Sequence, residues 1–240
     1  MAERESSRRS LLLTVTGVSA GWVLAGCATP SAGSKHGPAE SGEQKQEEDV
    51  SPAEDLMREH GVLRRVLFVY EESLRRLAAG EEVPPQTLAG GAQLIRRFIE
   101  DYHERLEEQF LFPRFEKAGR LLELVGVLRE QHARGRQLTA DVLRLATPEG
   151  LSNPDSVASL TRTLQSFIRM YGPHAAREDT ILFPALRQVI SANEYDALGE
   201  DFERKEHELF GADGFEGVVE EVATLEKALG IYELSSFTPR

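Results

Sequence analysis

The chain has 240 residues, of which 40% are hydrophobic and 28% charged, a composition typical of a globular protein and not of a disordered one. Its formal net charge is -12, from 28 Lys and Arg against 40 Asp and Glu, so we expect no nucleic-acid partner. The single cysteine, Cys27, excludes an intramolecular disulfide and any Cys-based zinc or iron–sulfur site within this sequence. Metal chemistry would therefore depend on nitrogen and oxygen ligands.

Residues 1–26 have the pattern of a signal peptide. Arg8 and Arg9 precede an apolar run, and the next charged side chain is Lys35. The arginine pair resembles a twin-arginine signal, and the Leu-Ala-Gly before Cys27 completes a sequence that resembles a bacterial lipobox. We expect cleavage before Cys27 and attachment of lipid to it, with an uncleaved N-terminal anchor as the alternative.

The same pattern predicts where the protein resides. Export and lipid attachment at Cys27 would hold it at the periplasmic or cell-surface face of a bacterial membrane, with the lipid as its membrane contact. Residues 27–50 are rich in Ser, Gly, Pro and acidic residues, which indicates a flexible, lipid-anchored linker. The twin-arginine route carries folded proteins, so this resemblance also implies that a metal is loaded in the cytoplasm.

From Ser51 onward the sequence predicts helices. Ser51, Pro52 and Glu54 supply a capping serine, a proline at the first helical position and a glutamate three residues after the cap. Apolar residues recur every three or four positions, and the connections are short, which favours an all-α, up-down-up-down four-helix bundle over residues 51–190. Residues 191–240 should add a C-terminal helical extension. The four helices are expected at Ser51–Gly80, Pro84–Pro113, Leu121–Ala146 and Asn153–Ser191, and one or two shorter ones from Ser191 and over Phe215–Leu229.

A pattern of histidine, glutamate and proline occurs twice. Each copy reads H-x-x-x-E, then five residues, then proline, and each is preceded by a further histidine about one helix earlier in the chain. Antiparallel helices of this length can bring all four histidines to one height in the bundle. The copies are His103, Glu107 and Pro113, and His174, Glu178 and Pro184; the earlier histidines are His60 and His132.

These residues predict a metal site inside the bundle. Residues four apart project from nearly the same helix face, so each H-x-x-x-E can present an imidazole and a carboxylate to one point in the core. Taken singly, each histidine is more typical of a core or surface residue and each pair of a surface ion pair, but the repeat argues against chance. Six buried ligands of this kind favour two cations, with iron preferred and manganese or zinc as competitors.

The bundle resembles a hemerythrin-like (HHE cation-binding) domain. That family has a histidine on its first helix, H-x-x-x-E on the second, a histidine on the third and H-x-x-x-[DE] on the fourth. The resemblance implies a four-helix bundle that holds two iron ions, with Glu107 and Glu178 as bridging ligands. The iron ligands that it implies are His60, His103, Glu107, His132, His174 and Glu178.

One position departs from the family pattern. Oxygen-carrying members have a second histidine four residues after the one on the third helix, where this sequence has Arg136, which cannot bind a metal. We expect Glu104 to replace it as a seventh ligand, because His103, Glu104 and Glu107 match the His-Glu-x-x-Glu of the hemerythrin domain in the iron-sensing F-box protein. A solvated helix acid is the alternative for Glu104. The departure argues against simple reversible oxygen carriage.

Other residues give weaker predictions. His207 could close over the site from the fifth helix, although we prefer an exposed position for it on an acidic helix. Tyr102 and Tyr171 could make hydrogen bonds to the ligands, or serve as core residues. Phe110 and Ile181, each seven residues after a histidine of the repeat, should cover the metals as an apolar lid, unless they are simply core.

Three functions follow from these observations. The first is a non-catalytic di-iron protein that binds, senses or scavenges O2, NO, peroxide or iron. The second is a carboxylate-rich di-iron oxidoreductase, either peroxide-reducing or iron-oxidising, which is favoured if Glu104 is a ligand. The third is a metal-free helical interaction protein, which metal analysis would identify.

Overall fold

We analysed a computed structural model of the chain, which describes residues 50–211 and 214–239. These residues belong to one compact unit, Glu47–Arg240. The predicted signal peptide, the lipidated Cys27 and nearly all of the linker lie outside the described residues, so these expectations stay predictions. Among the described residues, no helix has the length and apolar character needed to span a membrane.

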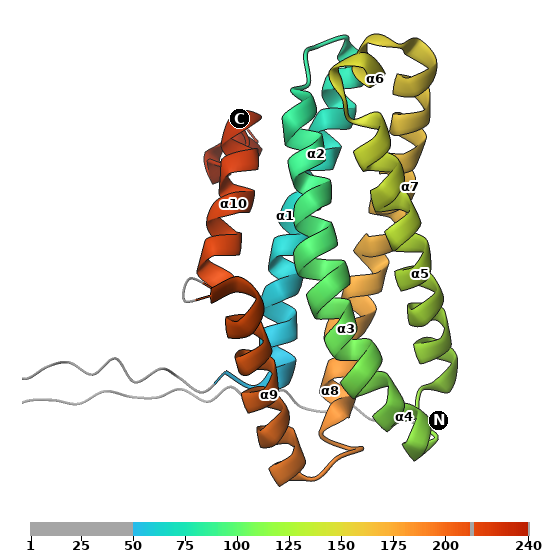
Figure 1. The fold of residues 1–240 in the computed structure, drawn as a ribbon, viewed down its shortest axis with the longest axis vertical. Coiled ribbons are helices and arrows are strands. Elements are labelled where there is room, and N and C mark those ends of the chain that lie inside the picture. Colours follow the sequence, from blue (N-terminus) through green and yellow to red (C-terminus); the bar gives the residue numbers. More distant parts are fainter. Residues whose placement is uncertain (1–49, 212–213, 240) are drawn as a thin grey trace, which may run out of the picture. The chain divides into compact units, whose positions relative to one another are not determined.

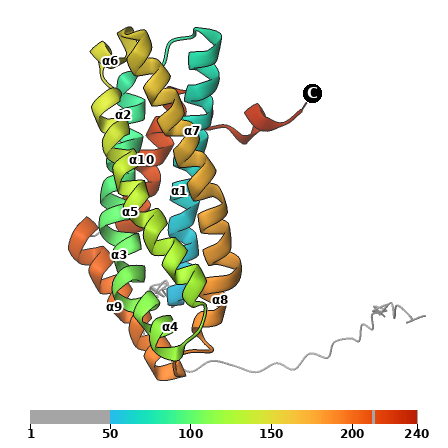
Figure 2. The same cartoon turned by 90° about the vertical axis from the view of Figure 1, so that its right-hand side faces the viewer.

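The described residues form an all-α bundle, as predicted, and contain no strand (Figure 1). The helices are α1 (Pro52–Ala79), α2 (Pro85–Leu94), α3 (Glu104–Leu106), α4 (Phe112–Ala118), α5 (Leu122–Leu145), α6 (Pro148–Ser152), α7 (Pro154–Arg177), α8 (Phe183–Leu186), α9 (Ala192–Phe210) and α10 (Gly214–Ala228). The π-helical segments are η1 (Ile95–His103), η2 (Glu107–Leu111) and η3 (Glu178–Leu182), and a short 3-10 helix is η5 (Leu234–Phe237). The helices form four long rods: α1, α2 through α4, α5, and α7 through α8. Neighbouring rods are antiparallel, and α9 and α10 lie along one side of them (Figure 2).

The predicted helix starts are confirmed by their caps. The Ser51 hydroxyl accepts a hydrogen bond from the Glu54 amide at the start of α1. The Asn153 side chain does the same for Asp155 and Ser156 at the start of α7. The helix α1 ends at Gly80, whose φ of 68° is a left-handed conformation that glycine adopts without strain. These local signals fix where the rods begin and end.

The second rod is longer than the sequence predicted. It runs without a break from Pro85 through α2, η1, α3, η2 and α4 to Ala118, and Pro113 lies in the first turn of α4 instead of ending the helix. A π-helical segment precedes this proline, and the wider turn leaves a position where a residue without an N–H is tolerated. The same arrangement recurs in the fourth rod, where η3 precedes Pro184 in α8. That rod ends at Leu186, earlier than predicted.

The rods pack around a single core. The helix α5 packs against α7 and α2, and α1 packs against α7, α2 and η1. Both predicted C-terminal helices are present, and α9 and α10 pack against α1, with α10 also contacting α2 (Figure 1). Buried aromatic and aliphatic side chains fill the interior, and the histidines and glutamates of the repeat are buried among them. The bundle therefore places polar side chains where burial is costly without partners.

Candidate metal centre

Glu178 lies between two histidines in the interior. Its Oε2 atom is 3.3 Å from His60 Nε2 on α1 and 3.0 Å from His174 Nε2 on α7. The Glu178 side chain is fully buried, and both imidazoles are nearly so. One carboxylate oxygen thus faces the Nε2 atoms of two different helices.

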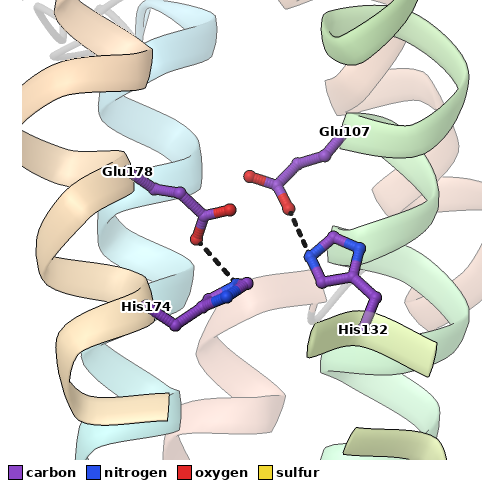
Figure 3. A group of neighbouring side chains, drawn as sticks. All are labelled: Glu107, His132, His174 and Glu178. Carbon is purple, nitrogen blue, oxygen red and sulfur yellow. Dashed lines mark ion pairs between the residues drawn. The ribbon is translucent and has the colours of Figure 1, made fainter. Parts of the chain in front are cut away.

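Glu107 occupies the equivalent place on the opposite side. Its Oε2 atom is 3.3 Å from His132 Nε2 on α5 and 3.8 Å from His103 Nε2 on η1. Figure 3 shows Glu107 and Glu178 pointing toward each other across the bundle, each beside the histidine paired with it there. The two halves of the sequence repeat therefore build two halves of one site.

The ligand atoms of the six predicted residues form two overlapping groups, each within 4.8 Å, and Glu178 belongs to both; a third group of the same kind joins His132 to Glu104 and Glu108. A carboxylate that belongs to two groups can bridge two cations, as the resemblance implied. The six residues predicted from the repeat are all brought together. The groups are Glu107, His132, His174 and Glu178, and His60, His103 and Glu178.

Two of the imidazoles are held by carboxylates through their other nitrogen. His103 Nδ1 lies 2.5 Å from Glu59 Oε2, and His60 Nδ1 lies 2.7 Å from Asp179 Oδ1. Arg64 also contacts the second Asp179 oxygen. A metal-binding histidine commonly donates its remaining ring N–H to such an acceptor, which fixes the ring so that the free nitrogen faces the metal.

The other two imidazoles have the same arrangement. His132 Nδ1 lies 3.1 Å from Glu108 Oε1, and His174 Nδ1 lies 2.9 Å from Gln131 Oε1. All four acceptors were missed by sequence reasoning. A signal existed, because each acceptor is the immediate sequence neighbour of a ligand on one rod and contacts the ligand of the next rod. The four are Glu59, Glu108, Gln131 and Asp179.

Most of the ligand atoms that face the interior of the site lack a hydrogen-bond partner among residues 50–211 and 214–239. Within the described part of the chain, no hydrogen-bond partner exists for the Nε2 atoms of His60, His103 and His132, or for either carboxylate oxygen of Glu107 and Glu178. Such buried polar atoms are costly, and cations at the two groups would satisfy them. The donor set of imidazole nitrogen and carboxylate oxygen fits a first-row transition metal.

The electrostatics of the two carboxylates differ. Burial and the nearby Glu178 raise the pKa of Glu107 well above its ordinary value. Burial also acts to raise the pKa of Glu178, but His174 and His60 hold that pKa well below its ordinary value. Without a cation, Glu107 therefore keeps a proton while Glu178 stays ionised. Cation binding would release that proton.

The pKa values of the imidazoles also differ from one another. Burial lowers the pKa of His132 to about 4 and that of His103 well below its ordinary value, so both rings are neutral and able to bind a metal. Burial also lowers the pKa of His60, but its interactions with Asp179 and Glu178 outweigh this and raise it to about 9. A cation must therefore displace a proton from His60 as well.

Comparison with known proteins agrees with this geometry. The family model for the Hemerythrin HHE cation binding domain matches residues 51–186 and also residues 123–230. The chain belongs to the hemerythrin HHE cation-binding family. It is 52% identical over 195 residues to uncharacterized proteins of Mycobacterium bovis and of Mycobacterium tuberculosis, over 81% of this chain and 76% of theirs. No solved structure matches the chain.

In this hemerythrin HHE domain, Glu104 contacts two side chains, and its carboxylate also lies within 4.8 Å of ligand atoms of Glu108 and His132. Its Oε1 atom accepts a hydrogen bond of 2.8 Å from the Tyr171 hydroxyl, and its Oε2 atom is 2.8 Å from Arg136 Nη2. Arg136 also donates to Glu108 Oε1 at 2.7 Å. Gly135 leaves room for the Tyr171 hydroxyl, since a Cβ atom there would lie 2.7 Å from Tyr171 Cζ. The position that departs from the family pattern thus holds a buried polar network.

The weaker predictions for the remaining residues have different outcomes. The Tyr171 hydroxyl donates to Glu104, and His207 is exposed on α9, as preferred. The expected apolar lid is wrong, because Ile181 is 41% exposed and Phe110 packs against Phe202, at 5.8 Å between ring centroids. Tyr102 is buried near Glu59.

Two other aromatic rings cover the centre instead. Phe112 stacks on His132 and Phe183 stacks on His60, each at 5.4 Å between ring centroids. Both phenylalanines come five residues after a ligand glutamate, across a π-helical segment. Counting by α-helical turns pointed to the wrong residues, because a π turn carries the chain about one residue further before it returns to the same face.

Proposed function

We propose that this hemerythrin domain holds two iron ions between Glu107 and Glu178, and binds a small molecule such as O2, NO or peroxide there. Metal-cation binding is what the family and the buried clusters have in common. The observation that carries the proposal is that each glutamate faces two histidine Nε2 atoms on different rods. Ferrous iron in such a site supplies an open coordination position and electrons for a diatomic ligand or peroxide.

Access to the centre favours a small, weakly polar ligand. A pocket of about 310 Å³ lies between α5 and α7, and His174 and Gln131 form part of its wall. Most of the remaining lining is apolar, including Leu124, Val127 and Leu128. His174 is also the most exposed of the six ligands, at 4%. A molecule of two or three atoms fits this approach.

The binding role is preferred over the oxidoreductase. The enzyme hypothesis depended on Glu104 as an additional carboxylate ligand, and the oxygens of Glu104 face Tyr171 and Arg136. An arginine cation beside Glu104 opposes a second cation at the same oxygen. We propose that Glu104 positions its neighbours and leaves the metals to the six residues of the repeat.

Anaerobic loading with ferrous iron tests the proposal. Wild-type protein and His207→Ala, which removes an exposed histidine, should retain equal iron, about two ions per chain after desalting. His132→Ala should lose most of it, because it removes a ligand from one group of the centre. Oxygen added to the reduced wild type should produce a stable charge-transfer absorption band without continued consumption. Equal iron in His132→Ala and His207→Ala would contradict the proposed site.

A further inference from the structure

A second group of ionisable side chains lies outside the metal centre, between α1 and α9. Asp55 and Glu59 on α1 and Glu206 on α9 bring carboxylate oxygens within 4.8 Å of one another. Glu59 is fully buried and the other two are half-buried. One arginine pairs with the group: Arg58 Nη1 is 3.9 Å from Asp55 Oδ1, and 39% of that arginine side chain is exposed.

Two buried polar atoms beside this group lack partners. In the described residues, neither Glu59 Oε1 nor the Tyr102 hydroxyl has a hydrogen-bond partner, although Tyr102 is only 1% exposed. Burial raises the pKa of Tyr102, and so do the charges of Glu59, Asp55 and Glu206. The group therefore has unsatisfied oxygen atoms at its buried end, as a vacant ligand set would.

Three carboxylates in one place repel one another. Burial, followed by the charges of Glu59 and Glu206, raises the pKa of Asp55 to about 7. A divalent cation would remove this cost. The donors are all oxygen atoms, which suits hard cations such as Mn²⁺ or Mg²⁺ and ferrous iron better than it suits soft ones.

The group connects the protein surface with the metal centre. On its outer side, Glu206 lines a polar pocket of about 460 Å³ that also includes Glu200, Glu203 and His207. On its inner side, Glu59 Oε2 contacts His103 Nδ1 at 2.5 Å. A cation that reaches Glu206 from solvent would lie one carboxylate away from a ligand of the centre.

We propose that Asp55, Glu59 and Glu206 form a further divalent-cation site, at which an ion from solvent binds before it enters the His/Glu centre. The site itself is independent of what the centre does. Its role in loading rests on the proposed function, because it requires that the centre receive iron.

Titration of the metal-depleted full chain with Mn²⁺, followed by electron paramagnetic resonance of the free ion, tests the site. Glu206→Gln should bind about one equivalent less than wild type, or bind it at least about tenfold more weakly. Glu203→Gln removes a charge from the same pocket outside the group, so it should match wild type. Equal Mn²⁺ binding by Glu206→Gln and Glu203→Gln would overturn the proposal.

Two further variants keep the result unambiguous. Glu206 also accepts a hydrogen bond from the Phe215 amide at 2.8 Å, so its substitution can loosen the contact between α9 and α10. Asp55→Asn leaves that bond intact and should show the same loss of Mn²⁺. In a His132→Ala background, the difference between Glu206→Gln and Glu203→Gln should persist, which separates this site from the centre.

The loading role has its own measurement. Stopped-flow uptake of ferrous iron into the metal-depleted protein should be several-fold slower in Glu206→Gln than in Glu203→Gln, with the same final iron content. Equal uptake rates would refute the loading role. A lower final content in both variants would instead count against the proposed centre.

Discussion

Substitution of Gly135 by alanine should be strongly destabilising, because this glycine gives Tyr171 its place in the core. A Cβ atom at position 135 would overlap the Tyr171 hydroxyl and lie 2.7 Å from its Cζ and 3.1 Å from its Cε2. Tyr171 is fully buried and packs against Phe167 and His174, so it cannot move aside. The contact distances are far shorter than packed side chains allow.

The cost can be estimated from two contributions. Overpacking in a filled core costs about 1–3 kcal/mol. Displacement of the Tyr171 hydroxyl also breaks its hydrogen bond to the buried Glu104, worth about 1.5–3 kcal/mol when one partner is charged. The higher helix propensity of alanine offsets about 0.5–1 kcal/mol of this loss of stability. We expect Gly135→Ala to lower the free energy of unfolding by about 2–5 kcal/mol.

Gly126 provides a matched control on the same helix. It is exposed on α5, and a Cβ atom there would contact nothing within 4 Å. Gly126→Ala should therefore stabilise the protein by about 0.5–1 kcal/mol. Urea denaturation of both metal-depleted variants, followed by circular dichroism, measures the difference. If both variants unfold at the same urea concentration, the packing argument for Gly135 is wrong.

Three other predictions concern the charged residues. Asp179→Ala should weaken iron binding about 10–100-fold, since Asp179 orients His60 through a 2.7 Å hydrogen bond; unchanged iron affinity would show that the bond does not matter. Glu104→Gln should keep the full iron content, and loss of iron as in His132→Ala would make Glu104 a ligand after all. Asp55 has a folded-state pKa of about 7 against an ordinary 3.8, so its contribution to stability is complete below pH 4 and is lost as the pH rises through 7. Metal-depleted Asp55→Asn should therefore match wild type near pH 4 and be more stable by up to about 4 kcal/mol at pH 8, and identical thermal melting of the two proteins at pH 8 would contradict that pKa.

The sequence was sufficient wherever the determining interactions are local. A capping side chain bonds an amide only two or three residues further along the chain, which is why Ser51 and Asn153 predicted the starts of two rods correctly. The spacing of His103 from Glu107, and of His174 from Glu178, also fixes a shared helix face. Their repetition was enough to predict that the six ligands meet.

Only the tertiary structure decided what surrounds those ligands. The acceptors that hold the imidazoles come from a different rod, up to 119 residues away in the chain for Asp179 and His60, and such pairing depends on how the rods are rotated. The π-helical segments change that rotation, so Phe112 and Phe183 cover the centre where helical counting named Phe110 and Ile181. Glu104 shows the same dependence, because the packing of α5 beside it brings Arg136 to its carboxylate.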